Sequence, residues 1–188
     1  MKFALSAAAL AFGLFAVPAA AQVASDAGPY LGVGVDTLSF DYGLVSARGG
    51  YNFNEVFGME GQLGLGVFGE NDDILGFDVD ADVDVFAAGF GTLRAPLSPS
   101  FDIVARGGYF FSQISVEATD GIDTFEADAD VDGFAAGVGG QFFFAPDRRS
   151  SVRVEYTYLD GGNGDVDGTD VDLDGGADLF SLSYIQRF

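Results

Sequence analysis

Carboxylates at short, regular spacing are the residues of this sequence best suited to binding chemistry. Asp170, Asp172 and Asp174, followed by Gly175, match the opening of a calcium-binding loop, in which alternate oxygen ligands precede a glycine turn. The match then ends, because the twelfth position of such a loop is Ser181 instead of a bidentate glutamate. We therefore expect at most weak divalent-cation binding at Asp170, Asp172 and Asp174, with a solvated anionic surface as the simpler interpretation.

A second group of polar side chains is embedded in apolar stretches, each on the opposite side of its segment from apolar neighbours. Its members are Arg48, Glu60, Gln62, Asp102, Arg106, Gln141, Arg153 and Glu155. Charges buried away from water must be paired, so the three arginines are predicted to neutralise the three acids. The favoured interpretation is a structural polar network that fills a narrow lumen. A small cation-preferring pore is the alternative if that network opens.

The composition removes most catalytic chemistries. The chain contains no His and no Cys, so it lacks the commonest general base, the commonest transition-metal ligand and any thiolate. The formal net charge of -21 excludes electrostatic binding of nucleic acid, which needs a basic stripe. We therefore predict a protein without catalysis and without a tightly bound cofactor.

Period-two alternation indicates which elements must position the embedded polar residues. Segments of roughly ten residues alternate apolar positions with polar or glycine positions. The segments are 30–38, 43–53, 57–67, 83–95, 101–113, 132–145, 151–160 and 178–188. The alternation is clearest in 57–67, where Phe57, Met59 and Leu63 share one face and Glu60 and Gln62 share the other. The pattern predicts eight β-strands.

The connections between these segments alternate in length and charge. Residues 52–56, 96–100 and 146–150 are short and rich in turn-forming residues, whereas 70–84, 117–132 and 160–178 are long and acidic. With Asp36 and Asp41 assigned to the first long-side connection, 23 of the 29 acids lie on one side. This sorting is typical of a transmembrane barrel. We predict an all-β, closed, eight-stranded antiparallel up-and-down transmembrane β-barrel with short periplasmic turns and long acidic extracellular loops.

The N-terminus has the parts of a secretory signal peptide. Lys2 gives a positive start, residues 3–17 form an apolar run, and Ala19 to Ala21 form a cleavage site after Pro18. The apolar run is too short to span a membrane comfortably as a helix. We expect cleavage before Gln22, so that residues 1–21 are a signal peptide and residues 22–188 are the outer-membrane β-barrel domain.

One internal repeat is present. Residues 80–91 recur as residues 128–139, and the two copies differ only at their sixth and eleventh positions. Both copies run from an acidic connection into a predicted strand, so both should cross the membrane in the same direction. Equal face assignment in the two copies predicts that Phe86 and Phe134 face lipid. The repeat glycines would then lie inside, at Gly89, Gly91, Gly137 and Gly139.

Several short segments, in this order and spacing, resemble a known family. They are Gly49-Gly-Tyr-Asn-Phe-Asn54, Phe57-Gly-Met-Glu60, Ala105-Arg-Gly-Gly-Tyr109, Val152-Arg-Val-Glu-Tyr156 and Phe180-Ser-Leu-Ser-Tyr-Ile-Gln-Arg-Phe188. The chain resembles the small outer-membrane β-barrel proteins related to the transmembrane domain of outer membrane protein A. The resemblance covers essentially the whole chain after residue 21 and implies a bacterial outer-membrane location.

The resemblance also implies that the outer-membrane barrel assembly machinery reads the last strand. Its assembly signal would be carried by Phe180, Leu182, Tyr184 and Phe188. Gln186 departs from the family pattern, because a hydrophobic or aromatic residue is usual there. We expect a monomer that contacts outer-membrane lipid and serves a structural role in envelope integrity or surface interaction.

Overall fold

The computed structural model describes residues 27–39, 42–68, 70–74, 77–119, 124–166, 169–171 and 175–188. Strands occupy nearly all of these ranges. They are β1 (Gly28–Leu38), β2 (Tyr42–Asn52), β3 (Phe57–Phe68), β4 (Glu70–Ile74), β5 (Phe77–Ser98), β6 (Phe101–Thr119), β7 (Thr124–Phe143), β8 (Ser150–Val166), β9 (Thr169–Val171) and β10 (Gly175–Arg187). Within those ranges, no helix has the length and apolar character needed to cross a lipid bilayer.

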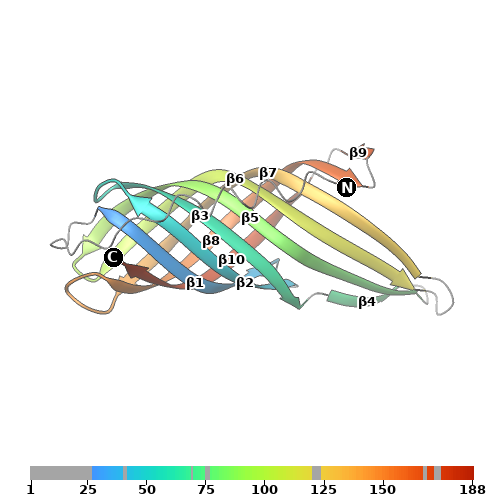
Figure 1. The fold of residues 1–188 in the computed structure, drawn as a ribbon, viewed down its shortest axis with the longest axis horizontal. Coiled ribbons are helices and arrows are strands. Elements are labelled where there is room, and N and C mark those ends of the chain that lie inside the picture. The colour runs from blue at the N-terminus through green and yellow to red at the C-terminus, as the bar shows by residue number, and fades with distance from the viewer. Residues whose placement is uncertain are drawn as a thin grey trace.

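The long strands close into a barrel (Figure 1). Each pairs antiparallel with its neighbours in the order β10, β1, β2, β3, β5, β6, β7, β8, and β10 also pairs with β8. At one height of the closing seam, Leu182 of β10 lies opposite Val35 of β1 and Val154 of β8. The predicted closed, eight-stranded antiparallel barrel is therefore confirmed, and β4 and β9 are additions at the ends of β5 and β8.

Three short connections lie at one end of the barrel, between β2 and β3, β5 and β6, and β7 and β8. In the first, the Asn54 side-chain oxygen accepts hydrogen bonds from the backbone N–H groups of Val56 and Phe57, both at 2.8 Å. This local bond replaces the missing ladder partners and fixes the turn. The predicted short turns are thus observed where the sequence places them.

The acid-rich connections contain more strand than the alternation alone predicts. β5 and β7 are 22 and 20 residues long, whereas β1 and β2 have 11 residues each. In both long strands the extra residues alternate acids with apolar residues, and this period-two pattern keeps the backbone ladder going. On one side, four strands consequently run past the ends of their neighbours (Figure 1).

Because of a β-bulge in the first copy of the internal repeat, equivalent residues of the two copies face opposite sides of the barrel wall. The β5–β6 register shifts between Val83 and Val85, and the shift leaves Asp84 unpaired in the ladder. Because an extra residue reverses which side of the sheet each later residue faces, Phe86 is buried in the lumen at 2% exposure, while Phe134 is 71% exposed outside. The prediction that both rings face lipid is therefore wrong for Phe86. The glycines of its copy are exposed for the same reason, at Gly89 and Gly91.

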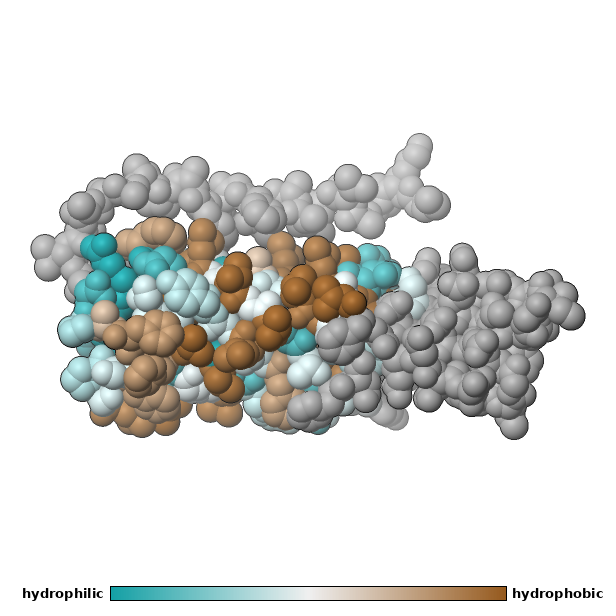
Figure 2. All heavy atoms as spheres, turned by 90° about the horizontal axis from the view of Figure 1, so that it is seen from below, coloured by the Kyte–Doolittle hydropathy of each residue, from teal (hydrophilic) through white to brown (hydrophobic). Residues whose placement is uncertain are grey.

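The outside of the barrel is apolar across its middle. Figure 2 shows hydrophobic residues gathered over one face of the described part. Aliphatic side chains from several strands are at least half exposed, among them Leu31, Val33, Leu65, Val138, Val154 and Leu182. A contiguous surface of this kind does not suit water. It matches the lipid-facing band of a transmembrane barrel.

Candidate functional site in the barrel lumen

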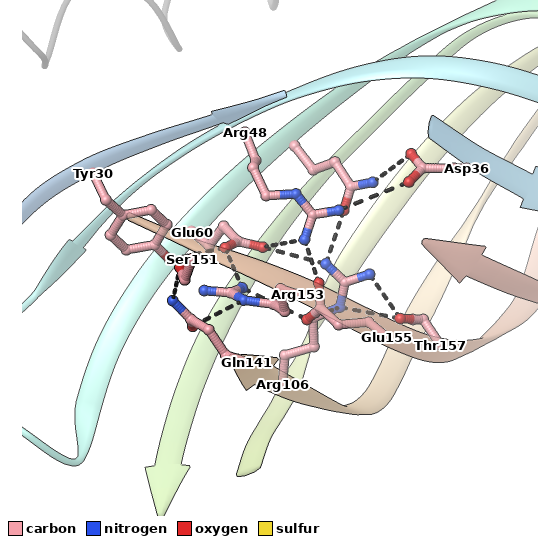
Figure 3. A network of polar contacts seen from close by, with 11 residues as sticks. Tyr30, Asp36, Arg48, Glu60, Arg106, Gln141, Ser151, Arg153, Glu155 and Thr157 are labelled. Atoms are coloured by element: carbon pink, nitrogen blue, oxygen red, sulfur yellow. Dashed lines mark hydrogen bonds and ion pairs between the residues drawn. The ribbon is translucent and has the colours of Figure 1, made fainter. Parts of the chain in front are cut away.

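Five of the predicted charged side chains meet inside the barrel (Figure 3). Arg48 comes from β2, Glu60 from β3, Arg106 from β6, and Arg153 and Glu155 from β8. Each occupies the inward position of its strand and is at most 4% exposed. Four strands, of which only β2 and β3 are neighbours in the sheet, thus deliver charges of both signs to the same height of the lumen.

Glu60 is the first centre of this charged network. Its carboxylate accepts hydrogen bonds from Arg153 Nη1 at 2.7 Å, Arg106 Nη1 at 3.2 Å and the Tyr30 hydroxyl at 2.8 Å. Arg48 Nη1 lies 3.5 Å from Glu60 Oε1. One carboxylate therefore contacts three guanidinium groups from three strands.

Tyr30 reaches Glu60 because of a glycine on the strand between them. Gly50 lies opposite Tyr30 in the β1–β2 register, and Glu60 lies opposite Gly50 in the β2–β3 register. A Cβ atom at Gly50 would overlap the phenol ring of Tyr30. The glycine therefore opens a path for the ring across the inner face of β2.

Glu155 is the second centre, and Asp36 completes the charge balance. Arg48 Nη1 contacts Glu155 Oε2, and the Glu155 Oε1 atom lies 3.6 Å from both Arg106 Nε and Arg153 Nη1. Arg48 Nη2 also lies 3.8 Å from Asp36 Oδ1. Three arginines thus face three carboxylates. Asp36 was expected in the first outer connection; it is instead on β1 with its side chain buried in the lumen.

Neutral side chains accept hydrogen bonds from further donors of the network, whereas Arg48 Nε and Nη2 have no hydrogen-bond partner. Thr157 Oγ1 accepts from Arg106 Nε at 3.0 Å and from Arg106 Nη2 at 2.7 Å. The two predicted glutamines also take part: Gln62 accepts from Arg106 and donates to Asp36, and Gln141 accepts from Arg153. Sequence reasoning did not identify Tyr30, Ser151 or Thr157. The available signal was that each of them occupies an inward position of its strand, at the same level along the barrel as the predicted charged residues.

Asp102 does not pair with the central arginines as predicted. It lies at the short-turn end, where Arg148 Nη2 donates to its carboxylate and Arg94 Nη1 is 3.8 Å away. The guanidinium groups of Arg148 and Arg187 stand 4.1 Å and 4.8 Å from the centre of the Phe143 ring. Arg148 comes from the turn before β8, so this second cluster connects that turn to side chains at the short-turn end of the lumen.

The other half of the lumen is apolar. Eight buried residues form one cluster there: Leu44, Val83, Phe86, Phe90, Phe110, Ala135, Leu159 and Leu179. The rings of Phe86 and Phe110 stack with their centres 6.1 Å apart. Arg106 links this apolar plug to the charged network, because its guanidinium carbon lies 4.2 Å from the centre of the Phe90 ring. The polar network predicted from sequence therefore fills only part of the lumen.

The two other predicted sites lie elsewhere. Asp170 belongs to β9, but its side chain, Asp172 and Asp174 fall outside the described residues. Among the side chains that are described, no group of three or more acids could hold a metal ion. Of the predicted assembly-signal residues, Leu182 and Tyr184 of β10 are exposed, Phe180 of β10 is partly buried, and Phe188 is exposed directly after the strand. The Tyr184 hydroxyl donates to the side chain of Gln186, the residue that departs from the family pattern, at 2.8 Å.

The lumen geometry supports packing better than reaction chemistry. Every charged group of the central network faces opposite charges at short range. Buried charges held this way fix side-chain positions and strand register.

Comparison with known proteins agrees with this architecture. Residues 7–184 match the family model of the outer membrane protein beta-barrel domain. No curated protein matches the sequence significantly. Solved structures resemble the fold at low identity, so they support the fold alone.

The attachment invasion locus protein Ail of Yersinia pestis is 12% identical with a TM-score of 0.56, covering 86% of this chain and 97% of that chain. The N-terminal β-barrel domain of Pseudomonas aeruginosa OprF is 9% identical with a TM-score of 0.53, covering 86% and 99%. A major outer membrane protein from Thermus thermophilus is 12% identical with a TM-score of 0.57, covering 86% and 100%. A further structure of the Yersinia pestis protein is a complex with the heparin analogue sucrose octasulfate. It is 14% identical with a TM-score of 0.54, covering 86% of this chain and 97% of that chain.

Proposed function

The chain belongs to the outer membrane protein beta-barrel domain family and lies in the bacterial outer membrane, and we propose that it is a closed, non-conducting structural barrel that carries an acidic surface outside the cell. Its role would be envelope integrity or surface interaction, without catalysis. The observation that carries the proposal is the filled lumen. A charged network and an apolar plug both lie in the lumen with their side chains buried, and an eight-stranded barrel has an interior just wide enough for side chains to fill.

The test is single-channel recording of the refolded protein in a planar bilayer. We expect no resolved channel openings in monovalent salt, with or without calcium. Steady, cation-selective conductance in wild-type protein would favour the small-pore alternative and contradict the closed barrel. A matched variant with Phe86, Phe90 and Phe110 all changed to Ser tests the sensitivity of the recording, because it removes the apolar seal while keeping the charged network.

The surface role follows from the distribution of charge. No basic residue stands between Arg48 and Arg94, between Arg106 and Arg148, or between Arg153 and Arg187. These three intervals contain all three acid-rich connections. A polysulfated ligand such as the one bound by the Yersinia pestis protein would meet only like charge there. We propose that this surface excludes polyanions and attracts cationic partners, with weak divalent-cation binding as a further prediction.

We also propose export by a signal peptide of residues 1–21, which lies outside the described residues. Amino-terminal sequencing of protein from outer membranes should begin at Gln22. Intact Met1 in inner-membrane fractions would contradict cleavage.

Assembly through the last strand has its own test. Phe188 is exposed at the short-turn end, and its backbone N–H donates to Pro29 O at 3.2 Å. Deleting Phe188 should lower insertion in cells much more than it lowers the stability of purified, refolded barrel. Heat-modifiable gel mobility measures the first quantity and urea unfolding in micelles the second. Normal insertion of the truncated protein would rule out a role of Phe188 in assembly.

A further inference from the structure

A groove lies on the outer wall of the barrel at the closing seam. Its volume is about 380 Å³, and residues of β1, β2, β3, β8 and β10 line it. Four of these residues, Val35, Val67, Val154 and Leu182, are each at least half exposed, so the groove opens on the side that faces lipid. The inward residues that also line it alternate with the outward ones along the same strands. A volume of this size is in the range of small-ligand sites in proteins.

The strand register explains why the wall is hollow at this place. Phe180, Thr37 and Gly43 lie opposite one another on β10, β1 and β2, and all three line the groove. Thr37 has a small side chain and Gly43 has none, so the wall is lowest over β1 and β2. On the other side of this row, the ring of Phe180 packs against that of Tyr156, with the ring centres 5.1 Å apart. This aromatic pair bounds the groove on the β8 side.

A β-bulge bounds the groove on the β3 side. Leu44 pairs with Gly66 and Gly43 pairs with Phe68, which leaves Val67 without a partner in the β2–β3 ladder. An extra residue in one strand bends that strand and increases its twist. The unpaired Val67 lines the groove and is 57% exposed. The groove therefore lies between a bulged strand edge and an aromatic pair, with small residues between them.

An acidic side chain follows the groove toward the long-strand end of the barrel. Asp178 precedes Phe180 by two residues on β10, so it stands on the same face of the strand, and it is exposed. Its Oδ1 atom accepts a hydrogen bond from the Tyr156 hydroxyl at 2.7 Å. The arginines among the described residues lie in the lumen network or at the short-turn end, away from this carboxylate. The groove thus combines an apolar hollow with a carboxylate at one end.

We propose that the groove binds one acyl chain of a phospholipid whose head group carries a primary ammonium, as in phosphatidylethanolamine. Continuity with the lipid-facing band identifies the chain, because Leu31 and Val33 share the outer face of β1 with Val35 and are more than half exposed. Charge complementarity selects the head group. An ammonium group is attracted to Asp178, whereas an anionic head group meets like charge there.

This inference goes beyond the proposed function, because it concerns the lipid-facing wall and does not depend on whether the lumen conducts. The orientation in the proposed function places the long-strand end, and with it the head group of the bound lipid, in the outer leaflet.

An introduced tryptophan can report on the lipids that contact the groove, since the chain has none of its own. Val154→Trp places the reporter at the edge of the groove, and Leu93→Trp places it on the exposed face of β5, outside the groove. Each refolded protein is placed in phosphatidylcholine nanodiscs that contain a fraction of a lipid with a brominated acyl chain, which quenches tryptophan fluorescence on contact. Quenching by brominated phosphatidylcholine at the same position is the reference, so the depth of the reporter cancels.

The expected result is a local enrichment of one lipid. Brominated phosphatidylethanolamine should be preferred over phosphatidylcholine by roughly threefold at Val154→Trp, the size expected for an exposed ion pair, and should show no preference at Leu93→Trp. Brominated phosphatidylglycerol should be depleted at Val154→Trp. Equal quenching by the three lipids at Val154→Trp, or a preference for phosphatidylglycerol, would overturn the proposal.

Variants in the Val154→Trp background separate the hollow from the charge. Thr37→Phe fills the floor of the groove and should remove the enrichment. Asp178→Asn keeps the shape but removes the charge, so the three lipids should then quench equally. Asp132→Asn is the matched control, because Asp132 accepts a hydrogen bond from Tyr109 in a second tyrosine–aspartate pair, on β7 and β6. It should leave the enrichment unchanged, and heat-modifiable gel mobility confirms that each variant is folded.

Two outcomes of the variants would contradict the site. Persistent enrichment in Thr37→Phe would show that the lipid chain does not enter the groove. Equal loss of enrichment in Asp178→Asn and Asp132→Asn would show a general effect of surface charge instead of a local head-group contact. Lipid quenching and bilayer conductance are separate measurements, so failure of the lipid site is distinguishable from failure of the closed-barrel proposal.

Discussion

The charged network and the apolar plug fill the same lumen by opposite physical means. In the network, Glu60 and Glu155 are stabilised only because arginines from other strands face them, so each charge depends on several partners. In the plug, Phe86 and Phe110 are stabilised by removal from water and by close packing. Removing one charge leaves others unpaired, whereas removing one ring leaves a cavity of defined size.

In a barrel whose outer surface faces lipid, the charged network and the apolar plug have different roles. Because lipid is already apolar, burial of the outer face supplies little driving force, and the lumen must provide specific packing. The network joins β2, β3, β6 and β8 through directional contacts, which can hold these strands in register. The plug consists of apolar side chains, which make no directional bonds, and we propose that their packing closes the lumen against water.

The largest expected effect comes from breaking the network at its centre. Glu60→Ala leaves three guanidinium groups facing one carboxylate fewer, and it should lower the free energy of unfolding by about 4–5 kcal/mol. Urea unfolding of the refolded protein in detergent micelles measures this. Glu55→Ala, an exposed glutamate on the turn before β3, should change stability by no more than about 0.5 kcal/mol. Equal stability of Glu60→Ala and wild type would mean that water solvates the network.

The next effect comes from the plug, and the internal repeat supplies its control. Phe86→Ala removes a buried ring and should cost about 3–4 kcal/mol, since it leaves a cavity. Phe134→Ala changes the equivalent residue of the second copy, which faces outward and contacts Tyr109 edge to face. It should cost only about 1 kcal/mol. Similar losses for the two variants would contradict the reversal of orientation at the Asp84 bulge.

The smallest expected effect is the coupling free energy between the charged network and the apolar plug. Arg106 belongs to the network, and its guanidinium lies over Phe90 of the plug. A double-mutant cycle with Arg106→Met and Phe90→Leu should give a coupling free energy of about 1 kcal/mol. The cycle of Arg106→Met with Phe134→Leu should be additive, because Phe134 lies outside the barrel wall. Additivity in both cycles would show that the layers are energetically independent.

Sequence alone predicts the barrel and the membership of most of the network. Period-two alternation places Arg48, Glu60, Arg106, Arg153 and Glu155 on inward positions, and the sorting of connections indicates closure. These predictions hold because parity is constant along an unbroken ladder. The predicted turns hold because local residues such as Asn54 form them without help from distant strands.

The remaining features depend on contacts that parity does not encode. The bulge at Asp84 reverses parity, and its sequence trace is the pair of adjacent apolar residues Val85 and Phe86, which has no counterpart in the second repeat copy. Asp102 shares the parity of the network but lies lower in the lumen, so it meets Arg148 from a turn. Strand tilt and stagger decide which inward residues share a height, and alternation does not contain that information.

The most direct measurement of the central claim is the accessibility of the lumen to water-soluble reagents. The chain has no cysteine, so a single one can be introduced at a chosen place. Ser46→Cys reports on an inward position of β2, and Ser100→Cys reports on the exposed turn between β5 and β6. With a charged, membrane-impermeant thiol reagent, a filled lumen predicts rapid labelling at position 100 and no labelling at position 46 until the barrel is unfolded. Labelling of both at similar rates in the folded protein would show a water-filled lumen and contradict the account.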